Sequence, residues 1–565
     1  MSNKYFIITI WLLFSNQVFS ATPNPVFAKN GMVVSTSRQA SEAGVEILKK
    51  GGNAIDAAVA VGFALSVTSP SNGNVGGGGF MVAHKANGDD FTLDYREKAP
   101  SNAHRNMYLD DSGNIIKDMS LHTRAASGVP GSVEGLLRVW EDHGSGNISM
   151  RELLAPAIAL AEKGFKLSHF EATRFNHFKN FFLKNDAAAK VFIRNDGQPW
   201  KADDIFKQKD LAQTLKRISR NGKKGFYMGK TADLIVAEME RGNGFITYED
   251  LLNYTSKYRE PVRGDFLEYD ILSMGPPSSG GAVLIEMLNM LELAQLDSLG
   301  WNSSEYIHLL TEVERIAYAD RAEHMGDSDF WDVPLDMLLS ENYATRRFSD
   351  ISMEKAAKSS DVFPGNPSGY ESKETTQYSV IDKDGNAVSV TTTINLSFGS
   401  GILVEGAGFF LNNEMDDFSS KPGTPNFYGL VGKEANAIAP GKRPLSSMTP
   451  TIVLKNGNPF MVTGSPGGST IITTTLQTIL NVTVHGMNIQ EAVSVPRTHS
   501  QWLPDVLFFE KRGLPQDVIQ NLERKGHLVK MHPWKYLGKA NAIVVTDDWI
   551  TGGADTRGEN TAVGY

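Results

Sequence analysis

The chain has 565 residues, no cysteine and a formal net charge of −9. Without cysteine it has no disulfide, no thiolate metal site and no lipid-modified N-terminal cysteine. A negative chain without a basic block lacks the positive footprint that nucleic-acid phosphates require, so no nucleic-acid partner is expected. The length suggests several domains, but there is no fixed-period repeat and only one linker-like segment, which favours one compact unit.

The N-terminus has the pattern of a secretory signal over residues 1–20. Lys4 precedes the apolar stretch 5–14, and small residues precede Ala21. The apolar stretch is too short to span a bilayer. We therefore expect an exported protein, periplasmic or secreted, without stable membrane insertion. An uncleaved membrane anchor is the alternative.

The first half of the chain is predicted to be mainly helical. Small and apolar residues recur at helical spacing over 40–51 and 54–68, most of 150–260 has a helical pattern, and a long helix is expected over 304–324. Gly76 to Gly79 precede a strand over 80–84. A phosphate-binding loop runs from strand to helix and carries Lys-Ser or Lys-Thr, so this order predicts a tightly packed turn and no nucleotide cofactor.

The middle of the chain contains a loop followed by a hairpin. Residues 356–374 are rich in Pro, Gly and Ser, which predicts an exposed, cleavable connection. A strand over 378–381, a turn over 382–386 and a strand over 387–395 follow. This arrangement suits an enzyme that cuts itself before Thr375, because the freed threonine carries a hydroxyl nucleophile and an α-amine base. An ordinary surface hairpin is the alternative.

The last third predicts strands over 451–454 and 460–464 and then a helix over 470–485, an α+β layering. Gly467 and Gly468 precede this helix, where two unhindered N–H groups suit a developing oxyanion. A plain strand-to-helix turn is the alternative. A serine-hydrolase elbow at Ser465 is excluded because Thr463 stands where its first glycine belongs.

Several polar residues suit a ligand that carries both charges. Arg96 can hold a carboxylate with two parallel hydrogen bonds, and Ser446 and Ser447 can add hydroxyl donors. Glu414 and Asp417 can hold an ammonium group. The alternatives are a surface ion pair between Arg96 and Glu97, a polar turn at the serines and a solvated acidic loop.

Metal patterns are weak. Residues 382–386 imitate a calcium loop, but the glycine comes two positions early and Thr393 replaces the final glutamate. None of the twelve histidines belongs to an H-E-x-x-H pair. No metal and no cofactor is predicted, and the histidines are interpreted as surface or core residues.

Several motifs occur together, in this order, along nearly the whole chain from about residue 30. They are GNAIDAA at 52–58, GGGGF at 76–80, YREKAP at 95–100, GVPG at 128–131, PPSSGG at 276–281, TTQYSV at 375–380, DKDGNA at 382–387, NNEMDDF at 412–418, RPLSSM at 443–448 and GSPGG at 464–468. In these motifs the chain resembles the γ-glutamyltransferases, also called γ-glutamyltranspeptidases. One departure is Gln377, where the family usually has histidine; we expect it to tune processing and not to abolish it.

The resemblance implies the four-layer αββα sandwich of N-terminal nucleophile hydrolases, an α+β fold. It also implies a large subunit, 21–374, and a small subunit, 375–565, cut from one precursor as a single compact unit. The implied catalytic residues are Thr375, with Thr393 as its hydrogen-bonding partner, and Gly467 and Gly468 as the oxyanion hole. Arg96, Ser446 and Ser447 are implied to hold the substrate carboxylate, and Asn395, Glu414 and Asp417 the ammonium. Residues 422–429 match the active-site loop, with Tyr428 as the gating aromatic residue.

The implied function is the cleavage of glutathione and other γ-glutamyl compounds through a γ-glutamyl-threonine ester, which water, an amino acid or a dipeptide resolves. One alternative is a cephalosporin or glutaryl acylase of the same family. Glu414 and Asp417 argue against it, because two carboxylates beside an uncharged part of a ligand are desolvated without compensation. A non-catalytic binding protein of the same fold is the other alternative.

Overall fold

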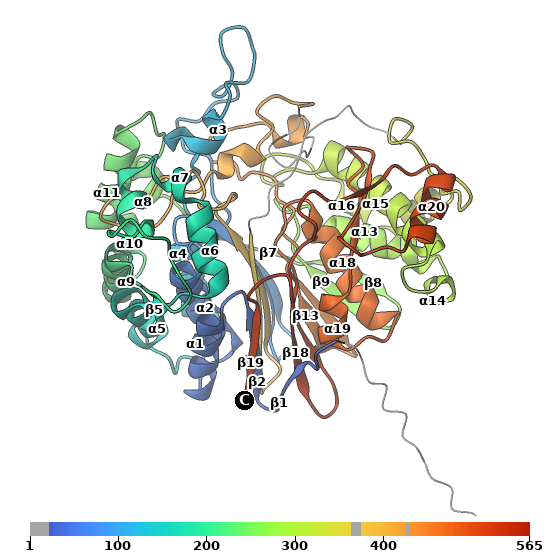
Figure 1. Ribbon diagram of the computed structural model, residues 1–565, viewed down its shortest axis with the longest axis horizontal. Coiled ribbons are helices and arrows are strands. Elements are labelled where there is room, and N and C mark those ends of the chain that lie inside the picture. The colour runs from blue at the N-terminus through green and yellow to red at the C-terminus, as the bar shows by residue number, and fades with distance from the viewer. Residues whose placement is uncertain (1–21, 363–374, 425, 427–429, 431) are drawn as a thin grey trace, which may run out of the picture.

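The computed structural model describes residues 22–362, 375–424, 426, 430 and 432–565. Two seven-stranded sheets stack at the centre of the molecule, and helices cover both outer faces (Figure 1). This confirms the four-layer αββα sandwich. Within the described residues, no helix is long and apolar enough to cross a membrane. The predicted signal peptide lies outside this part of the chain.

Each sheet is antiparallel throughout. Sheet I has the order β1 (Val26–Ala28), β18 (Ile550–Ala554), β17 (Asn541–Val545), β13 (Asn458–Thr463), β12 (Thr451–Lys455), β9 (Tyr269–Ser273) and β8 (Val262–Phe266). Sheet II has the order β19 (Thr561–Gly564), β2 (Gly31–Ser35), β10 (Thr376–Asp382), β11 (Ala387–Thr393), β3 (Gly78–His84), β4 (Asp90–Asp94) and β7 (Lys257–Arg259).

The helices form two outer layers (Figure 1). The layer on sheet II includes α1 (Arg38–Lys49), α2 (Ala54–Thr68), α4 (Ser132–His143), α5 (Met150–Lys163), α9 (Lys209–Asn221) and α11 (Gly229–Glu240). The layer on sheet I includes α13 (Gly280–Glu292), α15 (Ser304–His324), α18 (Thr470–Thr483), α19 (Ile489–Ser494) and α20 (Gln516–Lys525). Three apolar clusters hold the layers together, one between the sheets and one under each helical layer.

The early helices are close to their predicted bounds. α2 has the predicted range, because Asn53 and Asp56 form a capping box at its start and every residue is buried between α1, α5 and sheet II. α15 also has its predicted range, whereas α1 begins and ends two residues before the predicted helix. The 150–260 region is mainly helical, but it also contains the short strands β5 (Phe165–Lys166), β6 (Ile205–Phe206) and β7.

The glycine run at 76–79 is only partly a turn. Gly78 and Gly79 belong to β3, so the predicted boundary is wrong by two residues. The predicted close approach does occur at the other two. A Cβ on Gly76 would lie 2.2 Å from the carbonyl oxygen of Phe410, and one on Gly77 2.1 Å from that of Thr393. Only glycine therefore allows this turn to lie against the end of β11.

The β10–β11 hairpin lies in the middle of sheet II, between β2 and β3, and all its strand residues are buried. The surface-hairpin interpretation is therefore wrong. β10 begins two residues earlier than predicted, and β11 ends two residues earlier. The Asp382 carboxylate accepts hydrogen bonds from the backbone N–H groups of Ala54, Asp384 and Asn386. These donors account for the apparent calcium loop, because they satisfy the carboxylate that a metal would need.

The segment before Thr375 is described up to residue 362, and parts of it are anchored. Ala356 N donates to the Lys525 carbonyl at 2.8 Å, and Ser359 Oγ donates to the Trp502 carbonyl at 2.6 Å. Because both residues are buried, the prediction of an exposed loop is wrong at these two positions. The rest of the predicted loop, 363–374, lies outside the described residues.

Candidate active site

Thr375 immediately precedes β10, at the end of the hairpin where Thr393 closes β11. Thr376 pairs with Thr392 across the two strands, so the same register sets Thr375 opposite Thr393. Asn72 Nδ2 donates to the Thr375 carbonyl at 2.8 Å, and Asn395 N donates to Thr393 Oγ1 at 2.8 Å. Thr375 is therefore held by the centre of sheet II and by the loop after α2.

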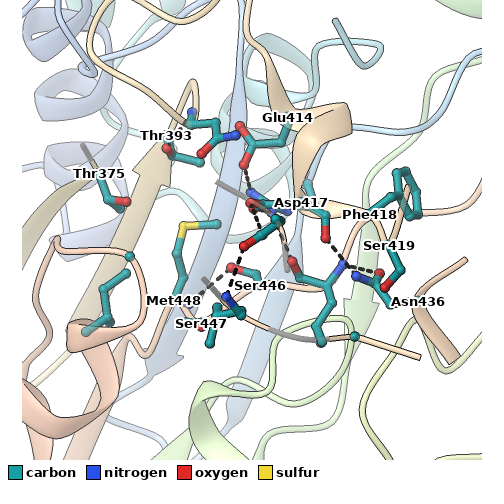
Figure 2. A pocket seen from close by; sticks show the side chains of 18 of the residues that line it. Thr375, Thr393, Glu414, Asp417, Phe418, Ser419, Asn436, Ser446, Ser447 and Met448 are labelled. Carbon is teal, nitrogen blue, oxygen red and sulfur yellow. Dashed lines mark hydrogen bonds and ion pairs between the residues drawn. The ribbon is translucent and has the colours of Figure 1, made fainter. Parts of the chain in front are cut away.

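A cavity opens beside Thr375 (Figure 2). Of the residues predicted for the site, all but Gly467 line it, and Gly467 adjoins the lining residue Gly468. These lining residues are Thr375, Thr393, Asn395, Arg96, Glu414, Asp417, Ser446, Ser447 and Gly468. The structure thus brings together residues that lie up to 372 positions apart in the sequence.

The charged residues of the cavity contact one another. Arg96 Nη1 donates to Glu414 Oε1, and Arg96 Nη2 donates to Asp417 Oδ2 at 2.5 Å. Glu97 lies 3.8 Å from the same guanidinium group. The side chain of Arg96 is 1% exposed, so the alternative of a surface ion pair is wrong. Glu414 is also buried and the Asp417 side chain is 13% exposed, so the acidic loop is not solvated.

The buried charges shift one another's protonation. Burial raises the pKa of Glu414 and of Asp417, although the positive charge of Arg96 opposes both shifts. Burial raises the pKa of Glu97 to about 8, again against the charge of Arg96. Burial disfavours the charged form of Arg96, but the carboxylates Glu414, Asp417 and Glu97 outweigh this and raise its pKa. Arg96 therefore stays cationic and the acidic side chains compete for it.

The serine pair lines the cavity next to Asp417 (Figure 2). Ser446 Oγ accepts a hydrogen bond from Met448 N at 3.0 Å, which makes a local turn. Ser447 Oγ accepts from Arg321 Nη2 at 3.1 Å, and Arg321 Nε donates to Ser279 Oγ at 2.8 Å. Burial raises the pKa of Asp417, and the charge of Arg321, like that of Arg96, opposes this rise.

Arg321 is a lining residue that the sequence analysis missed. It lies on α15, whose apolar stripe was interpreted as core. An arginine within a helix that is predicted to be buried is itself a signal in the sequence. Arginine is almost never fully buried unless it is paired, so such a residue needs a partner. Its partner Ser279 belongs to the PPSSGG motif at 276–281.

The two glycines lie between β13 and α18. Gly467 has a φ of +139° and Gly468 one of +58°, and the second value lies in the left-handed region that favours glycine. Their carbonyls accept hydrogen bonds from Thr470 N and Ile471 N at the start of α18. Among the described residues, neither glycine donates its own N–H to a hydrogen bond. Both donors are thus available next to a helix N-terminus.

Gln377 is buried on β10 between the two sheets. Its Oε1 accepts a hydrogen bond from Thr391 Oγ1 at 2.5 Å, and its Nε2 donates to Ser389 Oγ at 3.0 Å. A Cβ on Gly464 would lie 2.5 Å from Gln377 Oε1, so the side chain packs tightly on the end of β13. It lies two residues after Thr375 but does not line the cavity.

The loop predicted to gate the site is described only in part. Thr424, Asn426 and Leu430 line the cavity, and Asn426 Nδ2 lies 3.5 Å from Asp417 Oδ1. Tyr428 lies outside the described residues, so its gating role stays a prediction. Together, the αββα sandwich and a cavity beside Thr375, the residue just before the central strand β10, define a protein of the N-terminal nucleophile hydrolase class.

Comparison with known proteins narrows this class. The family profile described as gamma-glutamyltranspeptidase matches residues 40–565, and the chain belongs to this family. It is 45% identical over 544 residues to the glutathione hydrolase proenzyme of Escherichia coli (strain K12), covering 96% of this chain and 93% of that protein. It is 48% identical over 509 residues to the glutathione hydrolase proenzyme of Pseudomonas sp. (strain A14), covering 90% of this chain and 88% of that protein.

Solved structures agree with the fold. The cephalosporin acylase from Bacillus halodurans superposes with a TM-score of 0.84 at 26% identity, covering 98% of this chain and 99% of that chain. The Helicobacter pylori gamma-glutamyltranspeptidase superposes with a TM-score of 0.57 at 43% identity, covering 61% of this chain and 97% of that one.

Proposed function

We propose that this protein is a γ-glutamyltransferase and glutathione hydrolase that matures by cutting itself before Thr375. The observation that carries the proposal is the cavity beside Thr375, which is lined by two arginines, Arg96 and Arg321, and by two carboxylates. A γ-glutamyl group has both an α-carboxylate and an α-ammonium, so its recognition requires groups of both signs at one place. The names of the glutathione hydrolase proenzymes at 45% and 48% identity support the same activity.

In the proposed reaction, Thr375 Oγ attacks the γ-amide carbonyl, and the freed α-amine of Thr375 takes its proton. The N–H groups of Gly467 and Gly468 stabilise the oxyanion. The α-amine then returns the proton to the leaving amine, and a γ-glutamyl ester remains on Thr375. Water or the amine of an amino acid or dipeptide attacks this ester and regenerates the enzyme.

The charged cluster has a defined part in this proposal. Arg96 with Ser446 and Ser447 binds the substrate carboxylate, and Asn395, Glu414 and Asp417 bind the ammonium. In the free protein the carboxylates pair with Arg96. A zwitterionic head group exchanges these contacts for equivalent ones, so Arg96 and the two acids are not left as buried unpaired charges.

The acylase alternative is disfavoured by the same cluster. A relative named acylase ACY 1 proenzyme, from Pseudomonas sp. (strain SE83), is 36% identical over 552 residues. A glutaryl group has no ammonium, and it would draw Arg96 away from Glu414 and Asp417 without replacing it. Two buried carboxylates would then lose their cationic partner, which is costly.

The test of the proposal is the N-terminus of the small chain. Intact-mass analysis of the purified protein should find two chains, ending at Glu374 and beginning at Thr375, and the larger should begin at Ala21 if the signal is removed after export. Thr375→Ala should remain one chain and should not release p-nitroaniline from γ-glutamyl-p-nitroanilide. A small chain that begins elsewhere, or an active uncut protein, would overturn the proposal.

A further inference from the structure

A second group of functional side chains lies away from the cavity, under α15 and beside the turn after α20. His308 and Glu312 lie one helical turn apart on α15, and His527 follows α20. The three residues are 0%, 2% and 6% exposed. One ligand atom from each, an imidazole nitrogen from either histidine and a carboxylate oxygen from Glu312, lies within 4.8 Å of the other two. Three potential metal ligands therefore converge on one buried point.

The hydrogen bonds of His308 hold it in the orientation of a ligand. His308 Nε2 lies 2.7 Å from the carbonyl oxygen of Ser352. Because a carbonyl only accepts, Nε2 carries the proton and Nδ1 presents its lone pair. A histidine that binds a metal nearly always donates its other ring N–H in this way, to a carbonyl or a carboxylate.

The lone pair of His308 Nδ1 faces His527 Nε2 at 2.7 Å. In the absence of a metal, His527 donates its Nε2–H to this lone pair. Moving the His527 proton from Nε2 to Nδ1 offers a second lone pair without changing the charge of the ring.

Glu312 supplies the negative charge of the cluster. Its Oε2 accepts from Ala357 N at 3.1 Å, and its Oε1 lies 3.5 Å from Arg315 Nη2. Arg315 is the nearest opposing cation, and its Nη1 donates to Asp505 Oδ1 and Ser359 Oγ. Glu312 therefore shares the charge of Arg315 with Asp505.

We propose that His308, Glu312 and His527 bind a divalent transition-metal ion, with Zn²⁺ as the best fit. Two imidazoles and a carboxylate are an established zinc ligand set, and a water completes the tetrahedron. Zinc–nitrogen bonds of about 2.0–2.1 Å place two ligand nitrogens roughly 3.3 Å apart. The two rings must therefore separate by only about 0.6 Å from their hydrogen-bonded distance.

The position of the site gives the ion a structural role. His308 and Glu312 lie before Thr375, and His527 lies after it. The hydrogen-bonding partners Ser352 and Ala357 belong to the last described turns before the proposed cut. The ion would join the two mature chains, a task that disulfides cannot perform in a protein without cysteine. This role rests on the proposed maturation, whereas the site itself does not.

The experiment is a metal titration of the full chain after treatment with a chelator. Co²⁺ should bind at one equivalent with the visible absorption bands of a tetrahedral site, Zn²⁺ should displace it, and Zn²⁺ but not Mg²⁺ should raise Tm. His308→Gln and His527→Gln should each weaken Zn²⁺ binding at least about 100-fold, because each removes one of three ligands. Absence of stoichiometric Co²⁺ binding by the wild-type protein would overturn the proposal without any variant.

A matched control separates this site from adventitious binding. His485 packs its ring on Tyr306, two residues before His308 on α15, and does not belong to the cluster. His485→Gln should keep one equivalent of Zn²⁺, and equal binding by His485→Gln and His527→Gln would overturn the proposal. The uncut Thr375→Ala chain should bind Zn²⁺ like the wild type, so failure of the metal site and failure of the proposed maturation give different results.

Discussion

Arg96 has two roles, one in the free protein and one in the proposed complex, and both follow from its burial. In the free protein it pairs with Glu414, which is buried, and with Asp417, whose side chain is 13% exposed. In the proposed complex it holds the substrate carboxylate while the acids hold the ammonium. Because the same groups serve both states, the charge balance of the cavity does not change when the zwitterion binds.

Asp417→Asn tests this balance. The variant should lower kcat/KM for γ-glutamyl-p-nitroanilide about 10- to 100-fold, since a hydrogen bond to a charged group contributes about 1.5–3 kcal/mol. A glutaryl anilide lacks the ammonium and should lose much less. The measurement is therefore the loss of kcat/KM for the γ-glutamyl substrate divided by the loss for the glutaryl substrate. If the variant only displaced Arg96, both substrates would lose kcat/KM to the same extent.

Asp416→Asn is the matched control for that variant. Asp416 lies on the same short helix, but its carboxylate accepts from Ser120 Oγ at 2.6 Å and does not line the cavity. It should leave the ratio unchanged. Equal losses for the two substrates in Asp417→Asn would mean that Asp417 only supports the fold, and its assignment to the ammonium would fall.

Glu97 makes stability depend on pH. Burial raises its pKa from 4.5 to about 8 in the folded chain, so between these values the folded state holds a proton that the unfolded state has lost. The contribution of this proton to the free energy of unfolding is fully present below pH 4.5 and is lost as the pH rises through 8. Glu97→Gln cannot ionise, so its Tm relative to wild type should rise between pH 5 and pH 9.

The Tm series needs an exposed glutamate as its reference. Glu249→Gln, on the surface of the short helix α12 (Tyr248–Leu252), should run parallel to wild type over the same pH range. If Glu97→Gln also runs parallel to wild type, then Glu97 is ionised in the folded protein and the proposed protonation is wrong.

The strand-to-helix turn at Gly467–Gly468 is the element on which catalysis should depend most strongly. Gly468→Ala places a side chain at a φ of +58°, which costs about 1–2 kcal/mol and displaces the neighbouring N–H groups. Loss of one oxyanion donor reduces kcat about 100- to 1,000-fold. We expect a fall of this size in kcat with little change in KM, because the interaction forms only in the transition state.

Gly457→Ala is the control that separates the effect of backbone strain on stability from an effect on catalysis. Gly457 has a φ of +74°, lies in the turn between β12 and β13, and has open space where its Cβ would be. Gly457→Ala should lower Tm about as much as Gly468→Ala does, because both place a side chain at a positive φ. It should leave kcat unchanged. If both variants lose activity equally, the role assigned to the Gly467–Gly468 turn is wrong.

The sequence predicts single helices and strands well, but it predicts poorly which of them lie side by side in the fold. α2 and α15 have their predicted bounds because capping residues and apolar periodicity mark them within one window. The sequence predicts the hairpin but not its burial, because the flanking strands lie far earlier in the chain: Ser379 pairs with Val34 of β2, and Val388 pairs with Ala83 of β3. Arg321 was missed for the same reason, since only the fold brings α15 to Ser447.

The whole molecule interleaves the two proposed chains. In sheet II, β10 and β11 of the small chain lie between β2 and β3 of the large chain. In sheet I, β17, β18, β12 and β13 of the small chain lie between β1 and β9 of the large chain. The resemblance implied one compact unit made of two chains, and this topology explains how a cut before Thr375 leaves that unit intact.

We therefore expect the mature chains to stay together until the protein unfolds. Their contact consists of backbone ladders and apolar layers that salt does not screen, so both chains should elute as one particle from size-exclusion chromatography in 1 M NaCl, about ten times the ionic strength at which the Debye length is about 10 Å. Calorimetry should show one transition. The uncut Thr375→Ala chain should unfold with a similar enthalpy, because the cut lies just before β10 and breaks no strand pair. Chains that separate in salt, or two independent transitions, would mean that the two chains do not share the sheets as described.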